Sequence, residues 1–185
     1  VQDLTGLTEG TLYTAHLEVT DNAGNSETAN RTFKVDRAVP RATITPAATT
    51  HGFTDSSVYY RETAFSLSGI CDDATLSTGR KATSVVLSRS KDGAAATKIA
   101  STVVADGVPF GTDVISAQTW NFAQTVDVAG HGDDGLYVYT LVVTDDAGRS
   151  TTATATVRID TSAPTTIVTS PTAGEAVGVA TYTLQ

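Results

Sequence analysis

Residues 136–157 have the sequence LYVYTLVVTDDAGRSTTATATV, and residues 12–33 have the similar sequence LYTAHLEVTDNAGNSETANRTF. In both stretches apolar and polar residues alternate on either side of Asp-x-Ala-Gly, which is typical of two half-buried strands joined by a tight turn. Gly24 and Gly148 suit the positive φ that such a turn requires. Each stretch therefore predicts a β-hairpin.

The two hairpins are copies separated by a constant 124 residues. The aligned pairs include Tyr13 with Tyr137, Asp21 with Asp145, Asp36 with Asp160, and Pro40 with Pro164. A period of this length indicates repeated domains rather than one continuous domain. We therefore expect the closing hairpin of one unit at residues 1–37, a complete unit at 38–161, and the first strands of a third unit at 162–185.

Five further strands are expected in the complete unit before its closing hairpin. They lie at residues 42–46, 63–71, 84–90, 98–105 and 119–128, and the polar connection at 47–61 leaves room for a short edge strand. No segment keeps a helical period, so we expect negligible helix. Seven short strands with frequent turns predict an all-β, immunoglobulin-like Greek-key β-sandwich, repeated in a tandem array.

Tyr13 and Tyr137 each follow a glycine turn at the start of a strand, eight residues before the aspartate of the next turn. In immunoglobulin-like sandwiches such a tyrosine hydrogen-bonds to the loop before its strand. An ordinary strand aromatic is the alternative interpretation.

These motifs, together with the Val/Ile-Asp-x-x-x-Pro exit, resemble the bacterial immunoglobulin-like (Big-type) tandem repeats of large surface and adhesin proteins. The resemblance covers residues 6–47 and 130–171, and 61–110 match only in the number of strands. Asn25 fits the family's usual turn, whereas Arg149 departs from it. The resemblance implies a structural spacer in an extracellular bacterial surface protein, with neighbouring repeats of the same chain as partners and a distal region that binds.

Composition argues against several other functions. A net charge of −8 and a pI near 4.6 disfavour nucleic acid and anionic membranes as partners. Cys71 is the only cysteine, so the chain has no internal disulfide, and we expect a buried, inert thiol. The histidines, at positions 16, 51 and 131, have no metal-ligand spacing, and no nucleophile motif is present. We therefore expect no enzymatic activity.

Aspartates are concentrated where the predicted units meet. In this fold the loops after the second and sixth strands lie at the end where the chain enters. They carry Asp72, Asp73, Asp145 and Asp146, and the incoming linker carries Asp36. Such hard oxygen ligands suit Ca²⁺, and the resemblance implies calcium at these junctions. The alternative is that the aspartates only form turns, with Arg149 supplying the charge of a cation. Asp133, Asp134 and Asp160 would form the matching half of the next joint.

A binding module is the alternative function, either recognising carbohydrate or associating with other copies in a fibre. The long loops at 47–61 and 106–119 would carry the site for such a host or surface ligand. Tyr59 and Tyr60 are the one adjacent aromatic pair, and we expect one of them to pack inward. Trp120 is expected in the core.

Overall fold

The computed structural model describes residues 5–47, 58–73, 82–103, 110, 118–176 and 178, and only the backbone of 58 and 59. Every regular element in these residues is a β-strand, which confirms the all-β class. Within the same ranges no helix is long and apolar enough to cross a membrane.

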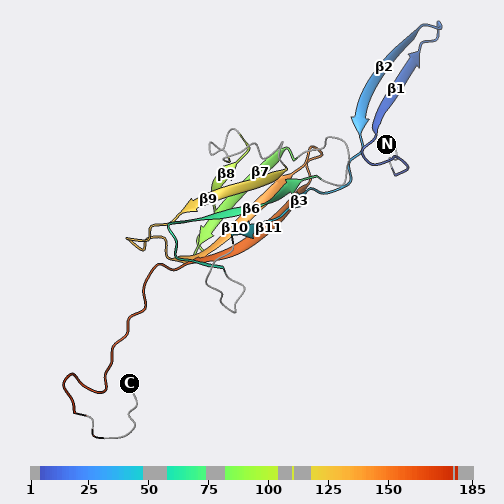
Figure 1. The fold of residues 1–185 in the computed structure, drawn as a ribbon. Coiled ribbons are helices and arrows are strands. Elements are labelled where there is room, and N and C mark those ends of the chain that lie inside the picture. Colours follow the sequence, from blue (N-terminus) through green and yellow to red (C-terminus); the bar gives the residue numbers. More distant parts are fainter. Residues whose placement is uncertain are drawn as a thin grey trace.

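Two sheets form a β-sandwich, and a separate hairpin lies beyond one end of it (Figure 1). The first sheet has the order β5-β11-β10-β7-β8: β5 Val58–Tyr60, β11 Ser150–Ile159, β10 Gly135–Thr144, β7 Ser84–Lys91, β8 Thr97–Ser101. In the second, β6 Ala64–Asp72 pairs with β3 Arg41–Ala42, β4 Thr45–Pro46 and β9 Thr119–Thr125. The hairpin consists of β1 Leu12–Thr20 and β2 Ser26–Lys34. All neighbours are antiparallel except β5 and β11.

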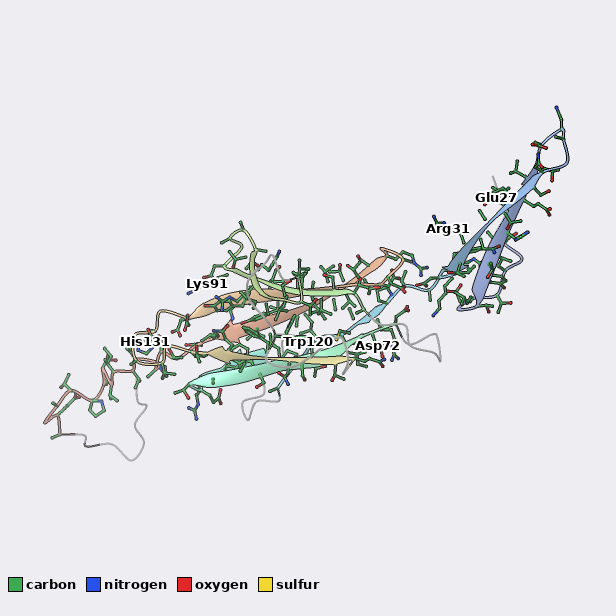
Figure 2. All side chains as sticks on the ribbon, turned by 90° about the horizontal axis from the view of Figure 1, so that it is seen from above. Glu27, Arg31, Asp72, Lys91, Trp120 and His131 are labelled. Atoms are coloured by element: carbon green, nitrogen blue, oxygen red, sulfur yellow. The ribbon has the colours of Figure 1, made fainter. Side chains whose placement is uncertain are left out.

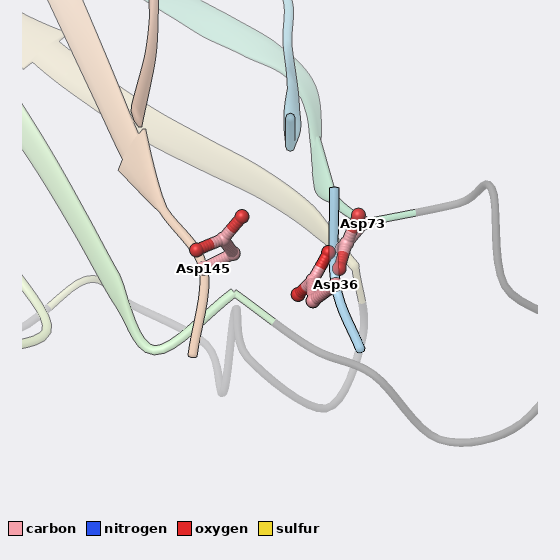
Figure 3. Close-up of side chains that lie close together, drawn as sticks. All are labelled: Asp36, Asp73 and Asp145. Carbon is pink, nitrogen blue, oxygen red and sulfur yellow. The ribbon is translucent and has the colours of Figure 1, made fainter. Parts of the chain in front are cut away.

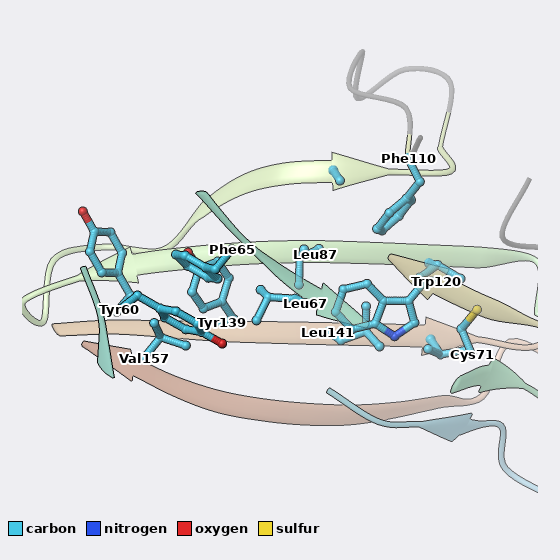
Figure 4. Packing of buried hydrophobic residues seen from close by; sticks show 14 of the residues in the cluster. Tyr60, Phe65, Leu67, Cys71, Leu87, Phe110, Trp120, Tyr139, Leu141 and Val157 are labelled. Atoms are coloured by element: carbon cyan, nitrogen blue, oxygen red, sulfur yellow. The ribbon is translucent and has the colours of Figure 1, made fainter. Parts of the chain in front are cut away.

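The core lies between the two sheets and follows the period of two seen in the sequence (Figure 4). Strand β10 buries Tyr137, Tyr139, Leu141 and Val143. Trp120 is 2% exposed, which confirms its expected place in the core.

The core also contains stacked aromatic rings and the buried thiol of Cys71. Tyr60 stacks on Phe65 with 4.1 Å between ring centroids, so Tyr60 packs inward as expected for one of the tyrosine pair. Cys71 is fully buried, and burial raises the pKa of its thiol to about 11. The thiol is therefore protonated at neutral pH, as an inert core cysteine would be.

The two hairpins have the same register at an offset of 124 residues. Leu12 faces Lys34 as Leu136 faces Arg158, and Thr20 faces Ser26 as Thr144 faces Ser150. Their burial differs, because β10 also pairs with β7 and faces the second sheet, whereas β1 pairs only with β2 among the described strands. Leu17 and Val19 are 60% and 59% exposed, but the aligned Leu141 and Val143 are fully buried.

The chain enters the sandwich at one end and leaves at the other. Figure 2 shows Asp72 at the end that faces the hairpin and His131 at the opposite end. After β11, residues 161–169 run without strand pairing. The strand expected from Thr165 is therefore not formed in the described part, since a strand requires a neighbour for its backbone hydrogen bonds.

The expected first strand is broken into β3 and β4 at Thr43 and Ile44. Opposite the break lies Gly69, where an added Cβ would be 2.0 Å from the carbonyl oxygen of Thr43. The hydroxyl of Thr43 accepts a hydrogen bond from the Ile70 amide at 2.8 Å, and its carbonyl accepts one from Trp120 Nε1 at 2.9 Å. The absence of a side chain at Gly69 thus brings the first strand close to the tryptophan.

We expect Gly69→Ala to lower the free energy of unfolding by about 1–3 kcal/mol, because backbone atoms would have to move to make room for the methyl group. Denaturant unfolding followed by Trp120 fluorescence measures the change. Ser68→Ala, at the exposed neighbouring position, is the control. Equal stability of both variants would contradict this account of the close contact.

Candidate cation site at the entry end of the sandwich

Three aspartates from three segments meet at the entry end (Figure 3). Asp36 lies in the linker after β2, Asp73 directly follows β6, and Asp145 directly follows β10. One carboxylate oxygen from each lies within 4.8 Å of the others. Asp73 and Asp145 are 1% and 2% exposed, and the Asp36 side chain is 2% exposed. These residues, the entry cluster, therefore concentrate negative charge in a buried place.

Local turn chemistry explains why Asp145 ends β10. Its Oδ1 accepts hydrogen bonds from the backbone amides of Ala147 at 2.9 Å and Arg149 at 2.8 Å. Gly148 has a φ of +81°, which glycine adopts readily. These contacts close the turn without any metal ion, as the turn interpretation requires.

The hairpin of β1 and β2 has the same turn. Asp21 Oδ1 accepts from the amides of Ala23 at 2.8 Å and Asn25 at 2.9 Å, and Gly24 has a φ of +90°. The aspartate and the glycine thus have one structural role in both copies.

Arg149 reaches from the turn into the entry cluster. Its Nη2 donates to Asp36 Oδ1 and lies 3.3 Å from Asp145 Oδ2, and the side chain is 26% exposed. One guanidinium against three carboxylates leaves an excess of two negative charges. Buried charges of one sign are unfavourable unless they are compensated. A divalent cation would balance the group.

The ligand chemistry of the entry cluster suits Ca²⁺. All three side chains offer carboxylate oxygens, which this hard cation prefers. Two oxygens bound to one Ca²⁺ at about 2.3–2.6 Å are at most about 5 Å apart, so the 4.8 Å spread of the three ligand atoms is compatible with one ion. Asp36, Asp73 and Asp145 are the residues that would hold it.

Of the five aspartates expected as ligands, the structure brings three together and leaves Asp72 and Asp146 outside the entry cluster. Asp72 accepts two hydrogen bonds of 2.7 Å from the guanidinium of Arg41, on the neighbouring strand β3. Successive side chains at the end of a strand point in opposite directions, so Asp72 and Asp73 cannot both face the linker. Asp146 is exposed in the turn.

The aligned tyrosines both bond to the segment before their strand. Tyr137 donates its hydroxyl hydrogen to the carbonyl of Asp133 at 2.9 Å. The Tyr13 hydroxyl accepts from the Thr8 amide at 2.7 Å. The loop that precedes each strand is thus tied to the strand that follows it.

An acidic side chain holds the outgoing linker of each hairpin. At the exit end, Asp134 accepts from the Thr161 amide at 2.9 Å and from the Ser162 hydroxyl at 2.8 Å. After β2, the amide of Arg37, which aligns with Thr161, donates to Glu9 at 2.6 Å. The sequence suggested Asp133, Asp134 and Asp160 as half of a joint, but the three form no metal-binding group among the described residues. The role of Glu9 was not predicted.

The described histidines bond to neutral side chains. His16 lies 2.7 Å from Asn30 Oδ1, and His131 lies 2.7 Å from Thr161 Oγ1, whereas His51 is outside the described residues. Most of the loops proposed for carbohydrate binding, at 47–61 and 106–119, are also outside them. Trp120 points into the core, so it offers no surface for a sugar.

No family model matches the chain, and no curated protein matches it. The resemblance to bacterial immunoglobulin-like repeats therefore stays a prediction.

We expect the contact between Asp134 and the outgoing linker to be lost only in acid. Burial raises the pKa of Asp134, but hydrogen bonds from Thr161 and Ser162 lower it by more, so it lies below its ordinary value of 3.8. The lowered pKa stabilises the folded state above the unfolded-state pKa, and this contribution is lost as the pH falls through the folded-state pKa. The NMR shift of the Thr161 amide should change below pH 3.8. The same transition in Asp134→Asn would assign it to another group.

Asp145→Ala should lower the free energy of unfolding by about 1–3 kcal/mol, because two backbone amides of the turn lose their acceptor. Asp145→Asn keeps an acceptor oxygen and removes the charge, so it should retain most of the stability. Thermal and denaturant unfolding of the full chain compare the two. If Asp145→Asn proved as damaging as Asp145→Ala, the charge rather than the turn would be the important property.

Proposed function

We propose that the chain is a segment of a tandem array of immunoglobulin-like Greek-key domains. The array would serve as a spacer or stalk of an extracellular bacterial surface protein. The observation that carries this proposal is the position of Asp36. This residue follows the separate hairpin, yet its side chain is buried at the entry end of the sandwich beside Asp73 and Asp145. A spacer requires joints that hold one unit on the next, and we propose that this contact serves as such a joint.

The burial of the two hairpins supports the array. Leu17 and Val19 lie exposed on β1, at positions where the aligned residues of β10 are core. A hairpin by itself is only marginally stable in water. We therefore propose that residues 1–37 close a preceding domain, that 38–161 form a complete one, and that 162–185 begin a third.

The topology supports the immunoglobulin-like assignment. The short strands β3 and β4 pair with β6 in one sheet, and β5 then pairs in parallel with the last strand, β11, in the other. The strand orders β5-β11-β10-β7-β8 and β3/β4-β6-β9 are those expected when the first segment of an immunoglobulin-like sandwich crosses from one sheet to the other. The bond from Tyr137 to the loop before its strand is a further feature of such sandwiches.

The mechanical role follows from the direction of the chain. It enters and leaves at opposite ends of the sandwich, so consecutive units would lie end to end (Figure 1). Strand β10 has 10 residues, which corresponds to roughly 33 Å at about 3.3 Å per residue. Tension along the array would load the hydrogen bonds of β3 and β4 with β6, and those of β11 with β10, in shear.

We further propose that the entry cluster binds Ca²⁺ through Asp36, Asp73 and Asp145. Together with Arg149 the bound ion would bring the net charge of the group to zero. Because Asp36 belongs to the linker and the other two ligands belong to the sandwich, the ion would restrain bending at the joint.

Calcium titration tests the metal site on the full chain. Calorimetry with CaCl₂ should detect binding, and a hundredfold excess over the Kd should stabilise the protein by about 2.7 kcal/mol. Asp73→Asn should abolish both effects. Asp72→Asn, one residue away but outside the entry cluster, should retain them and is the matched control. The absence of binding by the wild-type chain would overturn the calcium proposal.

Small-angle scattering tests the spacer. The full chain should be extended, and calcium should narrow the distribution of its dimensions relative to a sample with chelator. A compact particle, with the hairpin folded back along the sandwich in both conditions, would overturn the spacer function whether or not calcium binds.

A further inference from the structure

We infer that Arg149 is a tethered cation that keeps the linker docked at this joint when no metal ion is bound. We infer also that it makes calcium bind more weakly here than at a joint with a neutral residue in its place. The second part rests on the calcium site proposed above, whereas the first part does not.

The contacts of Arg149 join two segments that are far apart in sequence. The guanidinium belongs to the turn between β10 and β11, and Nη2 bonds to Asp36, 113 residues earlier in the chain. The same nitrogen lies 3.3 Å from Asp145 Oδ2. Arg149 therefore holds the linker against the turn by a side chain, in the place where a metal ion would join the same carboxylates.

The aligned turn of the first hairpin shows what a neutral residue does there. Asn25 has the same backbone position, and its Nδ2 donates to Asp21 Oδ2 at 2.9 Å. The asparagine side chain is short, and its amide group bonds within its own turn. It therefore cannot contact an incoming linker as Arg149 does. The two turns thus share their backbone hydrogen bonds and differ in the reach and charge of one side chain.

The charge of Arg149 has opposite effects on the linker and on a metal ion. It attracts the buried carboxylate of Asp36. It also repels any second cation among the same aspartates. A chelator removes calcium but cannot remove a side chain, so docking of this linker should survive chelation.

Arg149→Asn places asparagine at this position of the turn, as Asn25 is in the first hairpin. The variant tests both the tether and the effect on calcium affinity. Trypsin cleavage after Arg37 reports on docking, because the protease needs the linker in an extended, accessible form. With chelator, cleavage in the full-length variant should be at least tenfold faster than in the wild type. Calcium should slow it again, and calorimetry with CaCl₂ should show affinity at least tenfold above that of the wild type.

Arg31→Asn is the matched control, since Arg31 lies on the exposed hairpin and the same substitution there leaves the joint unchanged. Arg149→Lys keeps a positive charge and should recover much of the slow cleavage. Trp120 fluorescence verifies that the sandwich remains folded. If Arg149→Asn did not fold, Asp36→Asn would remove the other end of the contact and should accelerate cleavage in the same way.

Slow cleavage of Arg149→Asn with chelator, equal to that of the wild type, would overturn the tether. Fast cleavage that calcium does not slow, with no heat of binding in either protein, would support the tether and contradict the calcium site. Unchanged calcium affinity in Arg149→Asn would overturn the second part of the inference.

Discussion

The contact between the Asp36 carboxylate and the Arg149 guanidinium joins the linker that follows the hairpin to the sandwich. Both groups lie mostly out of water, where an ion pair is stable only while both partners are present. Removing one partner therefore weakens the compensation of the other buried charge. The linker carboxylate lies beside Asp73, Asp145 and Arg149, so the charges of all three act on its docking.

Much of the fold could be predicted because its signals are local. The repeat located both hairpins, and alternation located β6, β7 and β9 to within a few residues. The break between β3 and β4 could not be predicted, since it depends on the close approach of Gly69 and Thr43 from different strands. No local pattern encodes such a contact.

The candidate site was predictable only in part. The fold places the segments that carry Asp36, Asp73 and Asp145 at one end, and the structure brings their oxygens together. Alternation from Phe65 to Cys71 places Asp73 on the inward side and Asp72 on the other, so the sequence carried the signal that separates them. The bond of Asp72 to Arg41 depends on a cross-strand partner, which no local pattern shows. Likewise, Glu9 resembles any exposed acid until the path of the linker places Arg37 beside it.

Cys71 is buried without a second cysteine in the chain, so no disulfide joins one strand of the sandwich to another. If residues 38–161 form one unit of the array proposed above, unfolding under load would extend all 124 of its residues, to roughly 400 Å at about 3.3 Å per residue. A domain of the same size with an internal disulfide would reach a shorter extended length, because the residues between its two cysteines could not be stretched. In the proposed spacer, unfolding of one such unit would lengthen the array and lower the tension on its neighbours.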